Sequence, residues 1–361
     1  MTGSVLIVTW DGGGNVGPAI ALGQRLRQRG NDVRLMGWES LRSRTAAAGL
    51  KFSTYLSVPP WPADLAHEDG WAAIEAALGG EATTEDIRRV AAADPPDLIV
   101  YDCMMTAADA AVRELDVRSV ALVHVLYQPF VHEWGNDVLK TDVLTMLDRA
   151  DLVLATSPPG FDFPAPIPAN THYVGAITAP LSAGATALDG LDLRQLREPG
   201  DPWVLISLGT TLQRQHVAVP VILEALAELP VRVLLTTADL PLLNGLALPK
   251  NALRRGFAPH EQLLPYVELV VCHGGLSTVS TALAFGVPMV CLPQGREQPL
   301  NANRLTQVGA GITLGASAGL DAIRAAASEA LVSPAVRAAA QGFAHPNPGA
   351  RAADLVEKLL A

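Results

Sequence analysis

The sequence has few cysteines and no long hydrophobic run. The three cysteines, Cys103, Cys272 and Cys291, lie far apart in apolar segments without metal-ligand spacing. We therefore expect buried, reduced thiols and neither a disulfide framework nor a cysteine-bound metal. No window of about 18 uninterrupted apolar residues predicts a membrane span. The first apolar run, residues 5–8, is short and has no basic flank. This predicts the first strand of a cytoplasmic protein and not a signal peptide.

Positive charge is also scarce. Lysine and arginine total 26 against 36 aspartates and glutamates, which gives a formal net charge of −10. That balance argues against a general nucleic-acid binder and against stable binding to an anionic membrane. Hydrophobic residues make up 49% and charged residues 17% of the chain, as in a well-packed globular protein. A length of 361 residues predicts two domains, each able to bury its own core.

The amino-terminal half begins with the order strand, turn, helix, strand. Residues 5–8 and 32–36 are the expected strands, and a helix from Pro18 to Arg29 lies between them, followed by Gly30. This order predicts a parallel α/β domain.

The turn after the first strand contains G-x-G-x-x-G at Gly12, Gly14 and Gly17, and Glu39 follows at a distance suited to a ribose. Taken alone, this pattern allows an NAD-dependent oxidoreductase. The alternative is a glycine turn that keeps bulk away from a ligand cleft.

Two later strands of this half end in polar residues, Asp102 and His124. Open α/β sheets bind ligands at such carboxyl ends.

Residues 53–80 are irregular and carry Trp61 and Trp71, so we expect an apolar loop that faces a ligand or packs on the domain. A further aromatic segment, which includes Tyr127, Phe130 and Trp134, is a second candidate for binding an apolar acceptor.

The carboxyl-terminal half repeats the α/β pattern. Its expected strands are residues 203–207, 231–236, 253–256, 269–272, 288–292 and 311–314. We expect one domain over residues 1–180, a linker over 181–201, a second domain over 202–345, and a last helix within 346–361 that could pack back on the first domain. The predicted fold class is α/β.

The stretch from His273 to Thr278 predicts an anion site. It follows an apolar strand and begins a helix, where free N–H groups favour an anion. Gly274 and Gly275 allow close approach of the backbone, Ser277 and Thr278 add hydroxyls, and His273 can donate a further hydrogen bond or carry a positive charge. We interpret this stretch as a diphosphate cradle.

Several motifs of this half together resemble the donor site of family 1 glycosyltransferases, in particular the bacterial natural-product branch. They are residues 207–210 (SLGT), 256–260 (GFAPH), 273–278 (HGGLST) and P-x-x-x-E-Q at 293–298, followed by Asn301 and Arg304. The resemblance implies the GT-B fold, with two Rossmann-like parallel-sheet domains facing a central cleft.

The resemblance also implies residue roles. Phe257 would stack on the nucleotide base and His260 would stand near the ribose. His273, Gly274, Gly275, Ser277 and Thr278 would hold the two phosphates. Glu297 and Gln298 would bind the sugar hydroxyls, and Ser207, Gly209 and Thr210 would line the cleft. Such enzymes use no metal and no cofactor beyond the nucleotide sugar, because hydrogen bonds and the helix dipole stabilise the leaving diphosphate.

The amino-terminal half departs from the family pattern. Most relatives carry a catalytic histidine in G-H-x-x-P, whereas this chain has Asn15 there, and asparagine is no base near pH 7. Asn15 could still orient an acceptor hydroxyl. Asp102 aligns with the aspartate that pairs with the missing histidine, and we rank it first as general base, before Asp11 and His124. Thr281 replaces a glutamate common in relatives, which leaves ribose recognition open.

The hypothesis from the sequence is an inverting, metal-independent glycosyltransferase. It would move a sugar from a dTDP or UDP donor to an apolar small-molecule natural product, as in antibiotic biosynthesis. The alternatives are a catalytically silent GT-B protein that binds a nucleotide sugar or natural product to help a partner enzyme, an NAD-dependent oxidoreductase and, more remotely, a sugar-nucleotide epimerase. The sugar, the acceptor, O- or C-glycosylation and the oligomeric state, including a homodimer, stay open.

Overall fold

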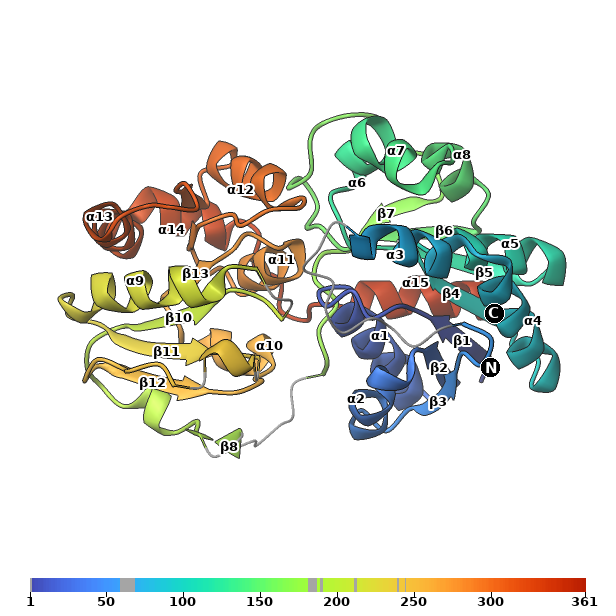
Figure 1. The fold of residues 1–361 in the computed structure, drawn as a ribbon, viewed down its shortest axis with the longest axis horizontal. Coiled ribbons are helices and arrows are strands. Elements are labelled where there is room, and N and C mark those ends of the chain that lie inside the picture. Colours follow the sequence, from blue (N-terminus) through green and yellow to red (C-terminus); the bar gives the residue numbers. More distant parts are fainter. Residues whose placement is uncertain are drawn as a thin grey trace. The chain divides into compact units, whose positions relative to one another are not determined.

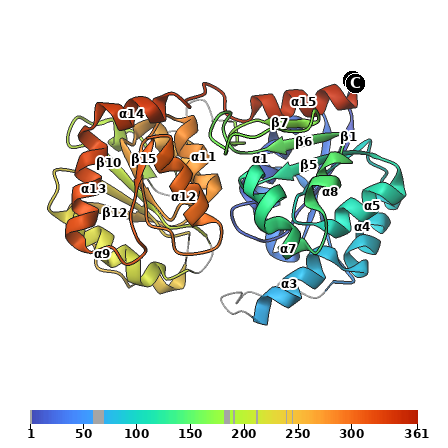
Figure 2. The same ribbon diagram turned by 90° about the horizontal axis from the view of Figure 1, so that it is seen from above.

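A parallel β-sheet organises each of the two units of the chain (Figures 1 and 2). The computed structural model describes residues 2–58, 69–180, 187–188, 191–210, 213–238, 240–243 and 245–361. Unit 1 comprises Met1–Pro180 with Asn347–Ala361, and unit 2 comprises Leu181–Pro346.

The sheet of unit 1 has the strand order β3-β2-β1-β4-β5-β6-β7, and every neighbouring pair is parallel. Its strands are β1 (Ser4–Val8), β2 (Asp32–Gly37), β3 (Lys51–Thr54), β4 (Leu98–Asp102), β5 (Arg118–Val123), β6 (Leu152–Ala155) and β7 (Thr171–Tyr173). β1 and β4 pair in the middle of the sheet, where the order of the strands reverses. Open sheets of this type bind ligands at that point.

Helices cover both faces of this sheet. They are α1 (Val16–Gln28), α2 (Arg42–Ala47), α3 (Asp69–Gly79), α4 (Glu81–Ala93), α5 (Thr106–Leu115), α6 (Tyr127–Pro129), α7 (Gly135–Leu139), α8 (Val143–Asp148) and α15 (Ala350–Leu360), with a short 3-10 helix η1 (Glu39–Leu41) and a short π-helix η2 (Phe130–Trp134). One core cluster joins the sheet to α3, α4, α5 and α8, and a second joins it to α1 and α15. Burial on both faces explains the continuous apolar strands.

The last helix is fixed to unit 1 by Arg25 of α1 and by Arg29, which directly follows α1. The buried Arg25 donates to the carbonyl oxygens of Thr178 and Pro348 at 2.7 and 2.6 Å, and to Asn347 Oδ1 at 3.0 Å. Arg29 forms ion pairs with Asp354 and Glu357 on α15. Because α15 also buries Ala352, Ala353 and Val356, the carboxyl terminus is part of the core of unit 1.

Unit 2 repeats the same plan with the strand order β12-β11-β10-β13-β14-β15. The strands are β10 (Trp203–Ser207), β11 (Arg232–Thr236), β12 (Ala252–Arg255), β13 (Leu269–Cys272), β14 (Met289–Cys291) and β15 (Gly311–Thr313), all parallel. The helices are α9 (Gln215–Ala227), α10 (His260–Leu263), α11 (Leu276–Ala284), α12 (Gln298–Gln307), α13 (Leu320–Val332) and α14 (Pro334–Gln341), with turns η3 (Gln195–Arg197), η4 (Pro241–Leu243) and η5 (Leu264–Tyr266).

The expectation of two Rossmann-like parallel sheets is confirmed. The segment expected as a linker contains a short antiparallel pair, β8 (Ala187–Leu188) and β9 (Leu191–Asp192), and buries Leu191, Leu193 and Leu196. The prediction that residues 53–80 are irregular was wrong in part, because β3 extends to Thr54 and α3 spans Asp69–Gly79. Alanine and leucine between Trp71 and Gly79 favour that helix.

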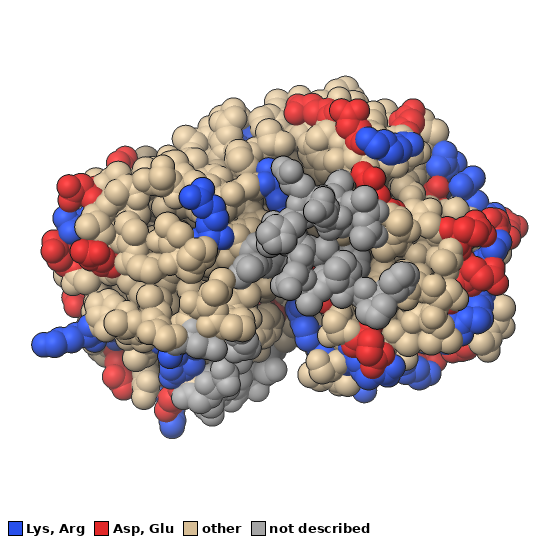
Figure 3. Space-filling view, in the orientation of Figure 1, with Lys and Arg blue, Asp and Glu red and all other residues tan. Residues whose placement is uncertain are grey.

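The surface and the helix lengths agree with the composition. Acidic and basic side chains are interspersed over the face of unit 1 in Figure 3, as the modest share of charged residues suggests. Among the described residues, no helix is long and apolar enough to cross a membrane.

Candidate functional site

In unit 2, the predicted cradle lies at the carboxyl ends of the two central strands, β10 and β13. His273 directly follows β13, and its ring lies against the turns at Gly209 and Gly275. A Cβ atom on Gly209 would come within 2.9 Å of His273 Nε2, and one on Gly275 within 2.5 Å. Both positions therefore need glycine while the histidine ring stays in place. Gly209 also has φ +89°, a conformation that favours glycine.

The helix that follows the cradle is suited to an anion. α11 starts after Gly275, and its first turn contains Ser277 and Thr278 but no acidic residue. The first N–H groups of a helix lack partners within the helix and carry a partial positive charge. Gly274, with φ +83°, makes the sharp turn into the helix, and Asn301 Nδ2 holds it by donating to the Gly274 carbonyl oxygen at 2.9 Å.

His273 and His260 are neutral hydrogen-bonding groups near pH 7. Burial lowers the pKa of His273 to about 4, against the opposing effect of a hydrogen bond with the Ser207 backbone. Burial also lowers the pKa of His260 to about 4. The charged alternative that the sequence left open for His273 therefore does not apply near pH 7.

The other predicted donor residues differ in how accessible they are. Phe257 is 45% exposed, which is unusual for phenylalanine and makes part of its ring accessible from solvent. Ser207 is buried at the end of β10, and Thr210 is exposed. Thr281 donates to the Ser277 carbonyl oxygen within α11 at 2.7 Å. Its hydroxyl is thus bonded within its own helix.

The Glu297–Gln298 pair begins α12. Glu297 is half-buried, whereas Gln298 is only 2% exposed. Gln298 Oε1 accepts from the backbone N–H of Gln294 at 2.8 Å, and its Nε2 donates to Gln213 Oε1 at 2.6 Å. The amide of Gln298 is therefore engaged in holding the loop before α12, and Glu297 is the more available of the two side chains.

In unit 1, Asp102 is the centre of a buried hydrogen-bond network at the carboxyl ends of β1, β4 and β5. Its Oδ1 accepts from Trp10 Nε1 at 2.9 Å and from the Met104 backbone N–H at 3.0 Å. Its Oδ2 accepts from Asn15 Nδ2 at 3.2 Å and lies 3.0 Å from His124 Nδ1. Each of these three residues, Asp102, Asn15 and His124, was predicted separately from the sequence, and the fold brings them together.

His124 is the least buried member of this network, with a side chain 13% exposed against 1% for Asp102. Burial alone would lower the pKa of His124, but the neighbouring charge of Asp102 and their hydrogen bond outweigh it. The pKa of His124 therefore lies well above its usual value of about 6.5.

The ligand atoms of Asp102, Cys103 and His124 lie within 4.8 Å of one another, a geometry that could hold a metal ion. However, burial raises the pKa of the Cys103 thiol and so disfavours the thiolate that a metal needs. Asp102 Oδ2 is also already shared by Asn15 and His124. The arrangement fits a hydrogen-bond network better than a metal centre.

The remaining predicted residues of unit 1 are more dispersed. Asp11 is half-buried and accepts from Ser40 Oγ at 2.6 Å. Tyr127 and Phe130 are fully buried in the core and offer no surface to a ligand, which differs from the expectation of acceptor-facing rings. Trp134 is half-buried and packs on Phe130 with ring centroids 5.0 Å apart. Trp61 lies outside the described residues, as does the side chain of Trp71.

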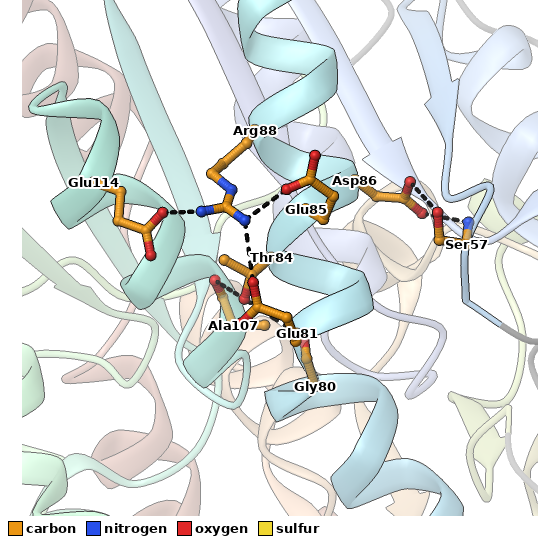
Figure 4. Close-up of polar contacts among 9 residues, drawn as sticks. All are labelled: Ser57, Gly80, Glu81, Thr84, Glu85, Asp86, Arg88, Ala107 and Glu114. Atoms are coloured by element: carbon orange, nitrogen blue, oxygen red, sulfur yellow. Dashed lines mark hydrogen bonds and ion pairs between the residues drawn. The ribbon is translucent and has the colours of Figure 1, made fainter.

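The chain before residue 59 is anchored by Asp86 on α4 (Figure 4). This carboxylate is fully buried and accepts from the backbone N–H groups of Leu56 and Ser57, both at 2.7 Å, and from Ser57 Oγ at 3.0 Å. A second cluster joins the half-buried Arg88 of the same helix to Glu81 and Glu85 of α4 and to Glu114 of α5. Asp86 was not predicted, because nothing local in the sequence pairs it with Ser57.

Trp10 is the main site residue that the sequence analysis missed. Its ring lies against Gly12, where a Cβ would come within 2.6 Å of it, and its indole N–H binds Asp102. The glycine turn thus accommodates a tryptophan. Gly17, the third glycine of the apparent dinucleotide fingerprint, has no described atom within 4 Å of a Cβ built on it. It therefore lacks the close helix–strand packing role that the fingerprint requires.

Comparisons with known proteins agree with this geometry. Residues 216–359 match the family model "Erythromycin biosynthesis protein CIII-like, C-terminal domain". A PGL/p-HBAD biosynthesis glycosyltransferase of Mycobacterium tuberculosis is 30% identical over 216 residues, 56% of this chain and 48% of the relative. Demethyllactenocin mycarosyltransferase of Streptomyces fradiae is 36% identical over 123 residues, 32% of this chain and 26% of the relative. The chain thus spans half or less of the length of these relatives.

Solved structures cover the whole chain. The spinosyn forosaminyltransferase SpnP aligns over 100% of both chains with a TM-score of 0.77 and 22% identity. The glycosyltransferase VinC in complex with dTDP covers 99% of each chain, with a TM-score of 0.74 and 21% identity. The spinosyn rhamnosyltransferase SpnG with spinosyn aglycone covers 99% of this chain and 100% of its own, with a TM-score of 0.70 and 22% identity. Residues 216–359 thus match this family model, and the chain as a whole has the two-domain GT-B fold of the solved glycosyltransferase structures.

Proposed function

We propose that this protein transfers a sugar from a nucleoside diphosphate, dTDP or UDP, to an apolar small-molecule natural product, with inversion at the anomeric carbon. The observation that carries the proposal is the cradle of unit 2. A glycine-rich turn, a neutral half-buried histidine and the start of a helix without acidic residues converge at the ends of β10 and β13. Such a site favours a diphosphate.

The donor would be held entirely by unit 2. The exposed Phe257 ring suits stacking on a pyrimidine base, and the N–H groups at the start of α11 suit the two phosphates. His273 would donate a hydrogen bond to a phosphate oxygen without adding charge. Glu297 would accept hydrogen bonds from sugar hydroxyls, while Gln298 keeps the loop in place. The dTDP complex of VinC supports dTDP as one of the two nucleotides to test.

The leaving diphosphate needs stabilisation as the glycosidic bond to phosphate breaks. Preorganised N–H donors and a helix dipole supply that stabilisation in a partly buried site. We propose that these groups are sufficient and that no metal ion takes part. Activity unchanged by EDTA would support this, and loss of activity that is restored by added Mg²⁺ would contradict it.

The acceptor would be held by unit 1, close to the network around Asp102. The aglycone complex of SpnG supports an apolar acceptor for a protein of this fold. Half-buried Trp134 and the segment around Trp61 and Trp71 are the candidates for contact with it, while buried Tyr127 and Phe130 would support them from the core. The attacking group is an acceptor hydroxyl or an electron-rich aromatic carbon.

Binding of the nucleotide tests the donor half first. At 100 times its Kd, a ligand stabilises the native state by about 2.7 kcal/mol, which raises the melting temperature of a domain of this size by roughly 5–10 °C. We expect this shift for dTDP or UDP and none for NADH, which is the ligand of the oxidoreductase alternative. Transfer or hydrolysis of the bound donor would then exclude a silent helper protein. No shift with either pyrimidine diphosphate at millimolar concentration would refute the proposal.

A further inference from the structure

The network around Asp102 contains a histidine that could take over the role of the missing one. In the family pattern the base stands at the position of Asn15. Here Asn15 Nδ2 donates to Thr9 Oγ1 at 3.1 Å, to the Trp10 carbonyl oxygen at 2.9 Å and to Asp102 Oδ2 at 3.2 Å. The amide is therefore fixed as a donor inside the turn. It cannot take a proton from an acceptor.

Asp102 is badly placed to contact an acceptor hydroxyl directly. Its side chain is 1% exposed. Both of its oxygens are occupied, Oδ1 by Trp10 and the Met104 backbone N–H, and Oδ2 by Asn15 and His124. A carboxylate with these partners can orient a neighbour and stabilise a positive charge. It has little room to accept a proton from a substrate.

His124 combines the features that Asn15 and Asp102 lack. It follows β5, next to β4 in the sheet, so its ring reaches Asp102 from the neighbouring strand. Its Nδ1 lies 3.0 Å from Asp102 Oδ2, which fixes Nδ1 as the protonated nitrogen and leaves Nε2 to accept. The side chain is partly exposed, and the Trp10 ring lies beside it with a centroid distance of 6.3 Å.

We propose that His124 is the general base of this protein and that Asp102 is its positioning residue. The proposal rests on the proposed function. The acceptor O–H gives its proton to Nε2, and the oxygen electron pair forms the bond to the anomeric carbon. At the same time the bond from that carbon to the diphosphate oxygen breaks, and the diphosphate leaves with the electron pair. Asp102 holds the tautomer and stabilises the imidazolium that forms.

This assignment changes the order of candidates given by the sequence, which placed Asp102 and Asp11 before His124. It also predicts how the transfer rate depends on pH. Among the described residues, the titratable groups facing the His124 ring are Asp102 and Cys103 at the end of β4, and Trp10 faces it from the end of β1 without charge. Because Asp102 favours the charged imidazolium, the rate should rise with pH to a plateau above neutrality.

The test uses the full-length protein with saturating donor and an accepted acceptor. We expect His124→Gln to lower kcat by about 10²–10⁴, as loss of a general base does, and to leave the Kd of dTDP or UDP within twofold. His172→Gln, at a half-buried histidine on β7 of the same unit, is the matched control and should keep wild-type kcat. Melting curves and nucleotide binding would show that each variant is folded.

Two further readouts separate a base from a structural residue. The rise of kcat with pH should vanish in His124→Gln, and it should shift to lower pH in Asp102→Asn, because the carboxylate no longer favours the imidazolium. Imidazole in solution should partly rescue His124→Ala. In a double variant, Asn15→His in the His124→Gln background should also regain activity, since position 15 already contacts Asp102 Oδ2.

The outcomes distinguish this inference from the proposed function. If wild-type protein transfers no sugar, the proposed function fails and the base assignment fails with it. If wild-type protein transfers sugar and His124→Gln has the same kcat and the same pH profile, only the base assignment is overturned. If His124→Gln stays active and Asp11→Asn instead shows the loss of kcat expected for His124→Gln, the general base is Asp11.

Discussion

Substitution of Gly275 by alanine tests the geometry of the donor cradle without removing any functional group. The backbone of Gly275 has φ −62° and ψ 134°, which alanine adopts without strain. The added Cβ, however, would lie 2.5 Å from His273 Nε2, so the ring must move. Overpacking of this kind costs about 1–3 kcal/mol when it is spread through a core. Here the strain falls on a partly exposed ring, so we expect it to appear mainly as displacement of His273.

The size of the effect follows from the role of the histidine. Loss of one preorganised donor to a developing negative charge typically costs about 2.7–4 kcal/mol, and we expect His273→Ala to fall in or just below that range. Gly275→Ala should approach this value and lower kcat/KM by about 10–100-fold, or roughly 1.4–2.7 kcal/mol. Gly315→Ala is the matched control in the same unit, because no described atom lies within 4 Å of its Cβ position.

The double variant His273→Ala/Gly275→Ala decides between the interpretations. If alanine at position 275 acts by displacing the ring, it should do no further harm once the ring is gone, so the double variant should match His273→Ala in kcat/KM. The assay is initial-rate kinetics with varied nucleotide sugar, together with urea unfolding of each variant. Additive losses in kcat/KM would refute the account of the cradle, as would wild-type kinetics in Gly275→Ala.

Three predictions concern stability. Asp86→Ala removes the buried carboxylate that accepts from the N–H groups of Leu56 and Ser57, and it should lower the free energy of unfolding of unit 1 by about 2–4 kcal/mol in urea titration. Glu85→Ala, at an exposed position of α4, should change this free energy little (Figure 4), and equal effects would contradict the anchoring role. Arg25→Leu should lower the free energy of unfolding of unit 1 by a similar amount, about 2–4 kcal/mol, and should expose α15 to amide hydrogen exchange. Full protection of α15 in this variant would contradict the prediction. His273 and His260 each have a pKa of about 4 in the native state, against an ordinary value near 6.5. Between these two values the unfolded chain binds more protons than the folded protein does. Their contribution to the free energy of unfolding is therefore intact above pH 6.5 and is lost as the pH falls toward 4, by up to roughly 3 kcal/mol each. The His260→Gln variant should therefore lose less stability than wild type between pH 7 and 4.5, and an equal loss would show that His260 titrates normally.

The sequence was informative wherever the structure depends on local pattern. Apolar runs predicted the strands β1, β10 and β13, and the order of strands and helices predicted two parallel sheets, all confirmed. The cradle could be located because strand, glycines and helix start are contiguous in the chain. The helix α15 was equally predictable, since its apolar residues recur with helical period and no glycine or proline interrupts them.

What the sequence could not provide are contacts between distant segments. Trp10 and Asp102 are 92 residues apart, yet their hydrogen bond explains why a tryptophan precedes the glycine turn. Asp102 could be named as a strand end, but its full set of partners, and hence its unsuitability as a base, depends on which strands are neighbours. Tyr127 and Phe130 looked like ligand-facing aromatics because aromatic residues are common to binding surfaces and to cores. Only burial distinguishes the two.

The most direct test of the central claim is a transfer reaction with purified protein. A panel of dTDP- and UDP-sugars is incubated with apolar hydroxylated acceptors, and products are analysed by mass spectrometry and by NMR of the anomeric centre. We predict a glycoside whose anomeric configuration is opposite to that of the donor, formed by wild-type protein and reduced at least tenfold in His273→Ala, a loss in keeping with that of one donor at the leaving diphosphate. Retention of the donor configuration, or equal product from wild type and His273→Ala, would contradict the account.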